Sequence, residues 1–453
     1  MQVLMGMLNA FSGFMWGWPL IIIISVTAVV YSVTLKFFQF RRFGYIVKNT
    51  FGKIFDKQIR GEGTLTPFQA ASSALAGTIG VGNIAGVGVA IGLGGPGALF
   101  WMWVVALLAA VAKFAEVVLS IHYREKDPET GIYRGGFMYM VKKGLGANWA
   151  WLASIWSFLF FVQFLVGGAV QSNALADVVA YSFGGNKLIV GIIIAVFVGF
   201  VILGGIKRIG KVAEKLVPLM AVIYFIGSMT IIILNITVLP SALAAIVRSA
   251  FAGMAPVGGF VGSTVMIGIR NGFARGVYSN EAGMGTSPFA HATATTDHPV
   301  RQGMWGIFEV FVDTIVMCTM TGLVIMTTGV LSSGEVGASL TAMAFRTGLP
   351  GVAGDLIVTV STILFAYTTI LLAEFYSETG GIYCFGNKIV FPFRVVFLIG
   401  IVIGAIGGLQ AVWGLFDAFM AATVSINLVV ILVLHKQVVS LTQDFFSKEK
   451  NNS

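Results

Sequence analysis

Residues 72–83 read Ser72-Ser73-Ala74-Leu75-Ala76-Gly77-Thr78-Ile79-Gly80-Val81-Gly82-Asn83, and two more glycines follow at Gly86 and Gly88. This glycine-rich run lies inside an apolar segment, 66–92, that is long enough to cross the ~30 Å hydrocarbon core of a bilayer. A glycine in a helix interior costs roughly 1 kcal/mol relative to alanine. Two explanations for the glycines are open: close packing of helices through small residues, or a helix that unwinds and frees backbone groups to bind a solute.

The whole chain is apolar. Of its 453 residues, 57% are hydrophobic and only 10% are charged, whereas a soluble domain has about 25% charged residues. The sequence therefore predicts an all-α polytopic membrane protein with about eleven transmembrane helices. We expect the spans at 14–37, 66–92, 97–121, 149–181, 187–205, 214–237, 241–286, 303–330, 354–377, 394–412 and 414–435.

The seventh segment, 241–286, is too long for one straight helix and is also rich in glycine, so we expect a second broken helix there. Two interrupted spans in corresponding places indicate a transporter site built from inverted repeats. Spans two to six and seven to eleven form two sets of five, and because five is odd the sets enter the membrane from opposite sides. We predict a first repeat at 66–237, an inverted second repeat at 241–435, and a peripheral extra helix at 14–37.

Lysine and arginine collect in alternate loops, which sets the expected orientation. The positive-inside pattern places the N-terminus outside and the C-terminal tail, with Lys436, Lys448 and Lys450, in the cytoplasm. The basic segment Lys36–Gly63 is either a loop or an amphipathic surface helix, and both readings keep it cytoplasmic. Topology thus explains the net charge of +9 better than nucleic-acid binding does.

Several functional classes find no support in the sequence. Cys318 and Cys384 are the only cysteines and form no CxxC pair. The four histidines have no zinc-site spacing, and no nucleophile–base set is present for a membrane enzyme. Without a phosphate-binding loop, ATP drive is not expected. A channel would need a continuous polar pore, whereas the spans offer isolated amides and hydroxyls. We expect no cofactor other than a coupling ion.

A broken helix presents free N–H groups to an anion and free C=O groups to a cation. An amino acid zwitterion needs both, because its charges would be costly to leave unpaired in an apolar interior. The amides of Thr78, Gly80 and Gly82 are the expected carboxylate site. Carbonyls around Ala76 and Ile79 face the other way and suit a cation.

Other polar side chains within spans have two readings each. The hydroxyls of Thr368-Thr369 could bind Na⁺, or could bond their own helix backbone. The amides of Gln163, Gln171 and Asn173 could line a ligand or bridge helices; Gln171 follows Gly167-Gly168 by one turn, which leaves room beside it. The ionisable residues within spans have three alternative interpretations: structural pairs that neutralise each other, a cytoplasmic gate of ion pairs, or a proton relay through the carboxylates. These residues are Lys113, Glu116, Arg270, Arg275, Glu281, Glu309 and Asp313.

Long motifs resemble the alanine or glycine:cation symporter family. They are Thr66-Pro67-Phe68-Gln69-Ala70, Gly77-Thr78-Ile79-Gly80-Val81-Gly82-Asn83-Ile84-Ala85-Gly86, and Asn271-Gly272-Phe273-Ala274-Arg275-Gly276-Val277-Tyr278-Ser279-Asn280-Glu281-Ala282-Gly283-Met284-Gly285. The likeness extends to Gly135-Gly136-Phe137-Met138-Tyr139, where Phe137 stands in place of an expected proline. It covers most of the chain.

The resemblance implies a prokaryotic plasma-membrane symporter with the leucine-transporter-type five-plus-five inverted repeat. It implies Na⁺-coupled uptake of alanine and glycine, with proton-coupled transport through Glu309 and Asp313 as the alternative. The expected substrate-binding residues are Ser72, Gly77, Thr78, Gly80, Gly82, Gln171, Asn173, Ile267, Gly268 and Gly272. The sodium site that the resemblance implies consists of Ala76, Ile79, Thr368 and Thr369.

Overall fold

The computed structural model is predominantly helical and describes residues 2–54, 61–255, 262–407 and 409–452. Its first half contains α1 (Gln2–Met15), α2 (Trp18–Thr34), α3 (Phe38–Arg41), α4 (Phe43–Asn49), η1 (Phe51–Lys53), α5 (Pro67–Thr78), η2 (Gly82–Gly86), α6 (Val87–Gly94), α7 (Gly97–Tyr123), α8 (Phe137–Tyr139), η3 (Met140–Leu145), η4 (Ala147–Trp149), α9 (Ala150–Phe183), α10 (Lys187–Ile202) and α11 (Gly205–Leu234). Strands β1 (Glu125–Lys126) and β2 (Tyr133–Arg134) pair antiparallel, with Glu125 opposite Arg134.

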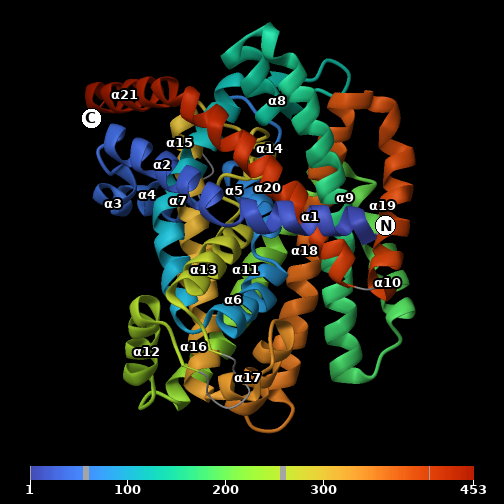
Figure 1. Ribbon diagram of the computed structural model, residues 1–453. Helices are drawn as coiled ribbons and strands as arrows, with labels where there is room; N and C mark the ends of the chain where they lie inside the picture. Colours follow the sequence, from blue (N-terminus) through green and yellow to red (C-terminus); the bar gives the residue numbers. More distant parts are fainter. Residues whose placement is uncertain (1, 55–60, 256–261, 408, 453) are drawn as a thin grey trace.

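The second half contains α12 (Leu239–Ala252), α13 (Val265–Asn280), α14 (Ser287–His291), α15 (Pro299–Val310), η5 (Phe311–Cys318), α16 (Thr319–Thr328), η6 (Val330–Ser333), α17 (Ala338–Gly348), α18 (Ala353–Phe385), η7 (Asn387–Ile389), α19 (Val390–Ile406), α20 (Leu409–Val433) and α21 (His435–Asn452). Helices α8 and α21 lie at one end of the molecule, and α12 and α17 at the opposite end (Figure 1). Between them, α7 packs against α13 and α15, while α9 packs along α18, α19 and α20.

The described residues include eight helices that are long and apolar enough to cross a membrane, or nine if the bent pair α5 and α6 is one span. Each of the eleven predicted apolar runs overlaps at least one helix of the described residues. The difference in number arises because α10 and α13 have only 16 residues each. The polytopic all-helical prediction is confirmed. The segment 241–286 is not one span, however, since α12 is a separate short helix that ends before α13 begins.

The first predicted broken helix is present. Thr66 starts α5 with a capping box, in which its hydroxyl accepts from the Gln69 amide, and Pro67 occupies the first turn. The helix ends at Thr78, and Ile79, with ψ of 89°, leaves the helical path. The chain resumes a helix at Gly82 in a direction bent by 48°. The glycine-rich run therefore marks a true break.

The second break lies later than the sequence suggested. Helix α13 ends at Asn280, after which Glu281 is left-handed with φ of 54° and Gly283 and Gly285 also have positive φ. Unwound residues 281–286 then lead into α14. Gly268 and Gly272 lie inside α13, where a Cβ on Gly272 would be 2.5 Å from the Ala98 carbonyl. Close packing therefore explains these two glycines, while Gly258 and Gly259 lie outside the described residues.

The basic segment after α2 folds as short helices rather than as one surface helix. Helices α3 and α4 pack against the C-terminal helix α21, where Tyr45 donates to Glu449 and the Arg42 guanidinium lies 4.1 Å from the Phe446 ring centroid. Residues 55–60 of this segment lie outside the described ranges. The contacts place the basic segment and the C-terminal helix at the same end of the molecule.

Candidate functional site

A small cavity lies where the two broken helices meet. Its volume is about 20 Å³, which is room for about one water molecule, so an amino acid enters only when the walls move apart. The breaks supply the wall together with α9, α18 and α20. The lining residues are Gly77, Thr78, Gly80, Gly82, Phe164, Gly167, Gln171, Tyr278, Glu281, Met284, Thr369, Ala373 and Phe416.

Three glycines bring the first break close to its neighbours. A Cβ on Gly77 would lie 3.0 Å from the Tyr376 hydroxyl, one on Gly80 would lie 2.4 Å from Thr369 Oγ1, and one on Gly82 would lie 3.2 Å from the Tyr278 ring. Backbone rather than side chain therefore forms this wall. The Gly80 amide already donates to Asn83 Oδ1 at 2.9 Å, so a carboxylate bound there would have to replace Asn83 as the acceptor.

The amide side chains predicted in α9 have different positions. Gln171 lines the cavity: its Oε1 accepts from the Val81 amide and its Nε2 donates to the Tyr278 hydroxyl, both at 3.4 Å. Asn173 instead donates to the Gly404 and Gly407 carbonyls and ties α9 to the end of α19. Gln163 accepts from the Thr423 hydroxyl. Of the three, the structure brings only Gln171 to the cavity.

The remaining predicted substrate residues lie apart from the cavity. Ser72 is buried within α5, and its hydroxyl has no hydrogen-bond partner among the described residues. Ile267 lies in the first turn of α13, 41% exposed, and lines another hollow together with Trp16 and Arg270. Gly268 and Gly272 pack against Gly94 and Ala98. The expected position of the unwound segment was too early in α13, and this displaced all three α13 residues.

Four oxygen atoms form a linked group, and Thr369 brings this group to the first break. Thr369 Oγ1 lies within hydrogen-bond distance of two carbonyls, Ala76 at 3.2 Å and Phe365 at 2.9 Å, which share its one hydrogen. Thr368 Oγ1 lies 3.0 Å from the same Phe365 carbonyl. Thr368 Oγ1 instead faces α11, where it lies 3.6 Å from Met220 Sδ. Ile79, at the point where α5 ends, leaves the helical path, and its amide donates to the Leu75 carbonyl. Both hydroxyls bond their own helix, and Thr369 also reaches across to α5.

The sequence did not single out Phe365. Its carbonyl lies three and four residues before the two threonines, and that helical spacing was the signal available. Hydroxyl and carbonyl oxygens are hard ligands that suit a small cation without a buried carboxylate. The residues present therefore fit Na⁺, which would replace the hydrogen bonds that now join these oxygens.

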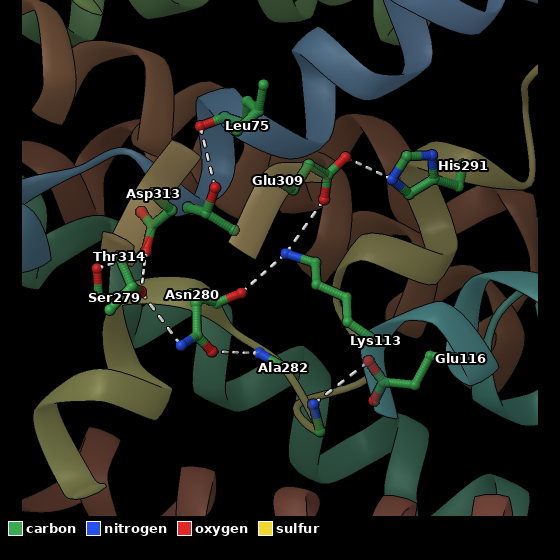
Figure 2. Close-up of polar contacts among 12 residues, drawn as sticks. Leu75, Lys113, Glu116, Ser279, Asn280, Ala282, His291, Glu309, Asp313 and Thr314 are labelled. Carbon is green, nitrogen blue, oxygen red and sulfur yellow. Dashed lines mark hydrogen bonds and ion pairs between the residues drawn. The ribbon is translucent and has the colours of Figure 1, made fainter. Parts of the chain in front are cut away.

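A buried ion pair holds the end of α13 (Figure 2). Lys113 Nζ lies 3.1 Å from Glu309 Oε2 and donates to the Asn280 carbonyl at 2.8 Å. Glu309 Oε1 lies 2.6 Å from His291 Nε2. All three charged or titratable side chains are fully buried. Lys113 therefore neutralises Glu309 and also binds the last carbonyl of α13, where the helix dipole is negative.

Glu116, one turn further along α7, binds the other side of the second break. Its carboxylate accepts from the Gly283 amide at 3.3 Å and the Gly285 amide at 3.1 Å, and Asn427 donates to it as well. Helix α7 thus supplies the Lys113 cation for the free carbonyl at the end of α13 and the Glu116 carboxylate for the free amides of the unwound segment. The sequence predicted structural pairs for these residues but not that the unwound backbone is their partner.

Asp313 joins the two breaks. It accepts from Asn83 Nδ2 and Ser279 Oγ, both at 2.7 Å, and from Thr314 Oγ1 at 2.9 Å. Asn83 belongs to the first broken helix and Ser279 to the last turn of α13. Asp313 therefore links the two broken helices through hydrogen bonds from three neutral side chains and not through an ion pair. The two arginines lie nearer the start of α13, where Arg275 is 3.8 Å from Asp417.

A cavity between two interrupted helices, crossed by buried polar groups inside a multi-pass membrane fold, defines the class of secondary transporters. Residues 1–453 match the sodium:alanine symporter family. The chain belongs to this family, whose members are transporters and not enzymes.

The chain is similar to two curated proteins over nearly its full length. It is 40% identical over 454 residues to the sodium/alanine symporter AgcS of Methanococcus maripaludis, covering 99% of this chain and 98% of that protein. It is 34% identical over 454 residues to the putative sodium/proton-dependent alanine carrier protein YrbD of Bacillus subtilis, covering 96% and 91%. These likenesses support symport of an amino acid.

A solved structure supports the fold independently. The manganese transporter of Eremococcus coleocola superimposes with a TM-score of 0.54 at 12% identity, covering 82% of this chain and 80% of that one. At this identity the likeness concerns the fold alone. It confirms the predicted leucine-transporter-type fold class.

Proposed function

We propose that this protein carries small amino acids, alanine and glycine, into the cell together with Na⁺. The observation that supports the proposal most directly is the meeting of both broken helices at one cavity. Thr369 lines this cavity and links it to the oxygens of Ala76, Phe365 and Thr368. Helix ends offer amides for a carboxylate and carbonyls for a cation. A wall of glycine backbone has no side chains to move aside, so it favours a small solute.

Sodium fits the oxygen group better than a proton does. The four atoms are two hydroxyls and two carbonyls, none of which takes up a proton near neutral pH. Proton coupling through Glu309 and Asp313 is the second candidate, favoured by their burial and by the name of the Bacillus relative. Both carboxylates already have partners in the structure, Glu309 with Lys113 and His291 and Asp313 with three neutral donors.

Uptake of [¹⁴C]alanine into liposomes that contain the purified protein should require an inward Na⁺ gradient and persist when the pH gradient is collapsed. Excess unlabelled glycine should compete. Leucine and phenylalanine should compete poorly, because the glycine backbone of the first break has no side chains that could move aside to make room for them. Uptake driven by a proton gradient in sodium-free buffer would contradict the proposal and promote Glu309 and Asp313.

Replacing Thr369 with valine should raise the Na⁺ concentration for half-maximal uptake by about tenfold. The change keeps the approximate shape but removes a hydroxyl oxygen that joins α18 to the Ala76 carbonyl and that would bind Na⁺. A tenfold change corresponds to about 1.4 kcal/mol, a modest loss for one of several oxygen ligands. Thr362→Val is the matched control, since Thr362 is buried in the same helix and, among the described residues, its hydroxyl bonds the Val358 carbonyl of its own helix and no other group. Equal sodium activation of both variants would show that the site lies elsewhere.

The proposal includes topology. We infer that the end with α3, α4 and α21 faces the cytoplasm of a prokaryotic cell and that the N-terminus lies outside, in agreement with the positions of lysine and arginine. We also infer the two inverted repeats, 66–237 and the second within 241–435. The second repeat then begins at Val265, because α12 precedes its broken helix.

A further inference from the structure

Glu281 stands out among the cavity residues. It is the first residue after α13, it has a left-handed φ of 54° that is uncommon for a residue with a side chain, and it is only 6% exposed. It is the one carboxylate among the residues that line the cavity. Its Oε2 has no hydrogen-bond partner in the described structure. A buried carboxylate with an unpaired oxygen therefore faces the space between the breaks.

The other carboxylates of this buried region are matched. Glu309 has Lys113 and His291, as described above. Glu116 has two backbone amides and Asn427, and Asp313 has three side-chain donors. Lys113 is the nearby buried lysine, but its ammonium pairs with Glu309, at 3.1 Å, and not with Glu281. Among the described residues, Glu281 thus has an unpaired carboxylate oxygen and no ion-pair partner, and a negative charge there is costly in an apolar interior unless a cation arrives.

We propose that Glu281 binds the ammonium group of the transported amino acid. This inference rests on the proposed function and adds which end of the solute faces which break. The first break offers amides to the carboxylate, and the second offers Glu281 to the ammonium. The site therefore selects a zwitterion and rejects monocarboxylates of the same size, such as propionate and lactate.

The backbone around Glu281 favours the same assignment. The residue follows the C-terminal end of α13, where the helix dipole attracts positive charge. Its left-handed conformation turns the chain at the cavity wall. Both features favour a cation beside Glu281, in the cavity that Gly80 and Gly82 also line. A cation that occupies this place satisfies the carboxylate, and an ammonium brought by the solute does so only while solute is bound.

The test is competition for [¹⁴C]alanine uptake in proteoliposomes. With the wild type, unlabelled alanine should inhibit, while propionate and lactate at the same concentrations should not. E281Q keeps the shape and removes the charge, so its KM for alanine should rise about 10- to 100-fold, the size expected for a charge-assisted hydrogen bond. Its preference for alanine over lactate should fall by a similar factor, and its half-saturating Na⁺ concentration at saturating alanine should stay near the wild-type value.

Two further variants complete the experiment. Glu335→Gln makes the same chemical change in an exposed loop and should behave as the wild type. E281D keeps the charge but withdraws it by one methylene, so its KM should rise less than that of E281Q. If E281Q does not fold, E281D and the wild-type analogue series still decide, because wild-type inhibition by propionate as strong as by alanine overturns the proposal.

The remaining outcomes are distinct. An E281Q protein with the wild-type KM and discrimination overturns the assignment of Glu281 alone. A variant that changes only Na⁺ or pH dependence assigns Glu281 to a coupling ion and also overturns it. A wild-type protein that takes up no amino acid under any ion gradient refutes the proposed function itself, before any variant is compared.

Discussion

Replacing Gly80 with alanine should depress the uptake of every substrate by about tenfold or more. The added Cβ would lie 2.4 Å from Thr369 Oγ1, so the Thr369 side chain, the first break or α18 must shift. Overpacking of this kind costs about 1–3 kcal/mol, and here the displaced atom belongs to the proposed sodium site. Alanine also favours a continuous helix over an unwound one by roughly 1 kcal/mol. Both effects act against the open backbone that binds solute.

Gly400→Ala is the matched control for this change. Gly400 lies within α19, and a Cβ there would meet nothing within 4 Å. Its replacement should leave uptake unchanged and stabilise the helix slightly. Initial rates of [¹⁴C]alanine and [¹⁴C]glycine uptake, normalised to reconstituted protein, compare the two variants. Normal alanine uptake by the Gly80→Ala protein would show that the first break does not form the binding wall.

The first broken helix was predictable because its glycines coincide with a segment that must otherwise be helical. Gly77, Gly80 and Gly82 follow a strong helix start at Thr66-Pro67, and the apolar run continues beyond them. A chain that crosses a bilayer has few alternatives to helix, so a local loss of helix propensity at mid-span indicates a break. Composition and apolar length also fixed the polytopic all-helical class.

The second break was less predictable because glycine has two uses in membrane helices. Gly268 and Gly272 let α13 approach α6 and α7, which is packing, whereas Gly283 and Gly285 adopt positive φ in the unwound segment. In the sequence alone, the two packing glycines and the two glycines of the unwound segment cannot be told apart. The useful signal was Glu281, an ionisable residue next to two closely spaced glycines at membrane depth, and its environment depends on neighbours far away in the chain.

The partners of the buried charges also lay beyond sequence reasoning. Lys113 and Glu116 reach backbone groups of Asn280, Gly283 and Gly285, which are 167 to 169 residues away along the chain. Such contacts follow from how α7 packs on α13 and not from any local pattern. For the same reason the sequence could not show that Gln171 lines the cavity while Asn173, two residues further along α9, bonds the end of α19.

Replacing Lys113 with methionine should strongly destabilise the protein and abolish uptake. Glu309 would lose its fully buried cation and the Asn280 carbonyl would lose its donor. Removing one partner of a buried pair costs about 3–5 kcal/mol, because the other charge is left uncompensated. Thermal unfolding of the detergent-solubilised protein should show a clearly lower midpoint than the wild type.

A second substitution separates charge from contact. Glu309→Gln added to Lys113→Met removes the uncompensated charge and should restore much of the stability, but uptake should stay low because nothing then binds the last carbonyl of α13. Lys448→Met is the control, since Lys448 is 66% exposed and pairs with Asp444 at the surface, where such pairs contribute about 0–1 kcal/mol. Equal unfolding midpoints for Lys113→Met and Lys448→Met would mean that the buried pair does not hold the second break in place.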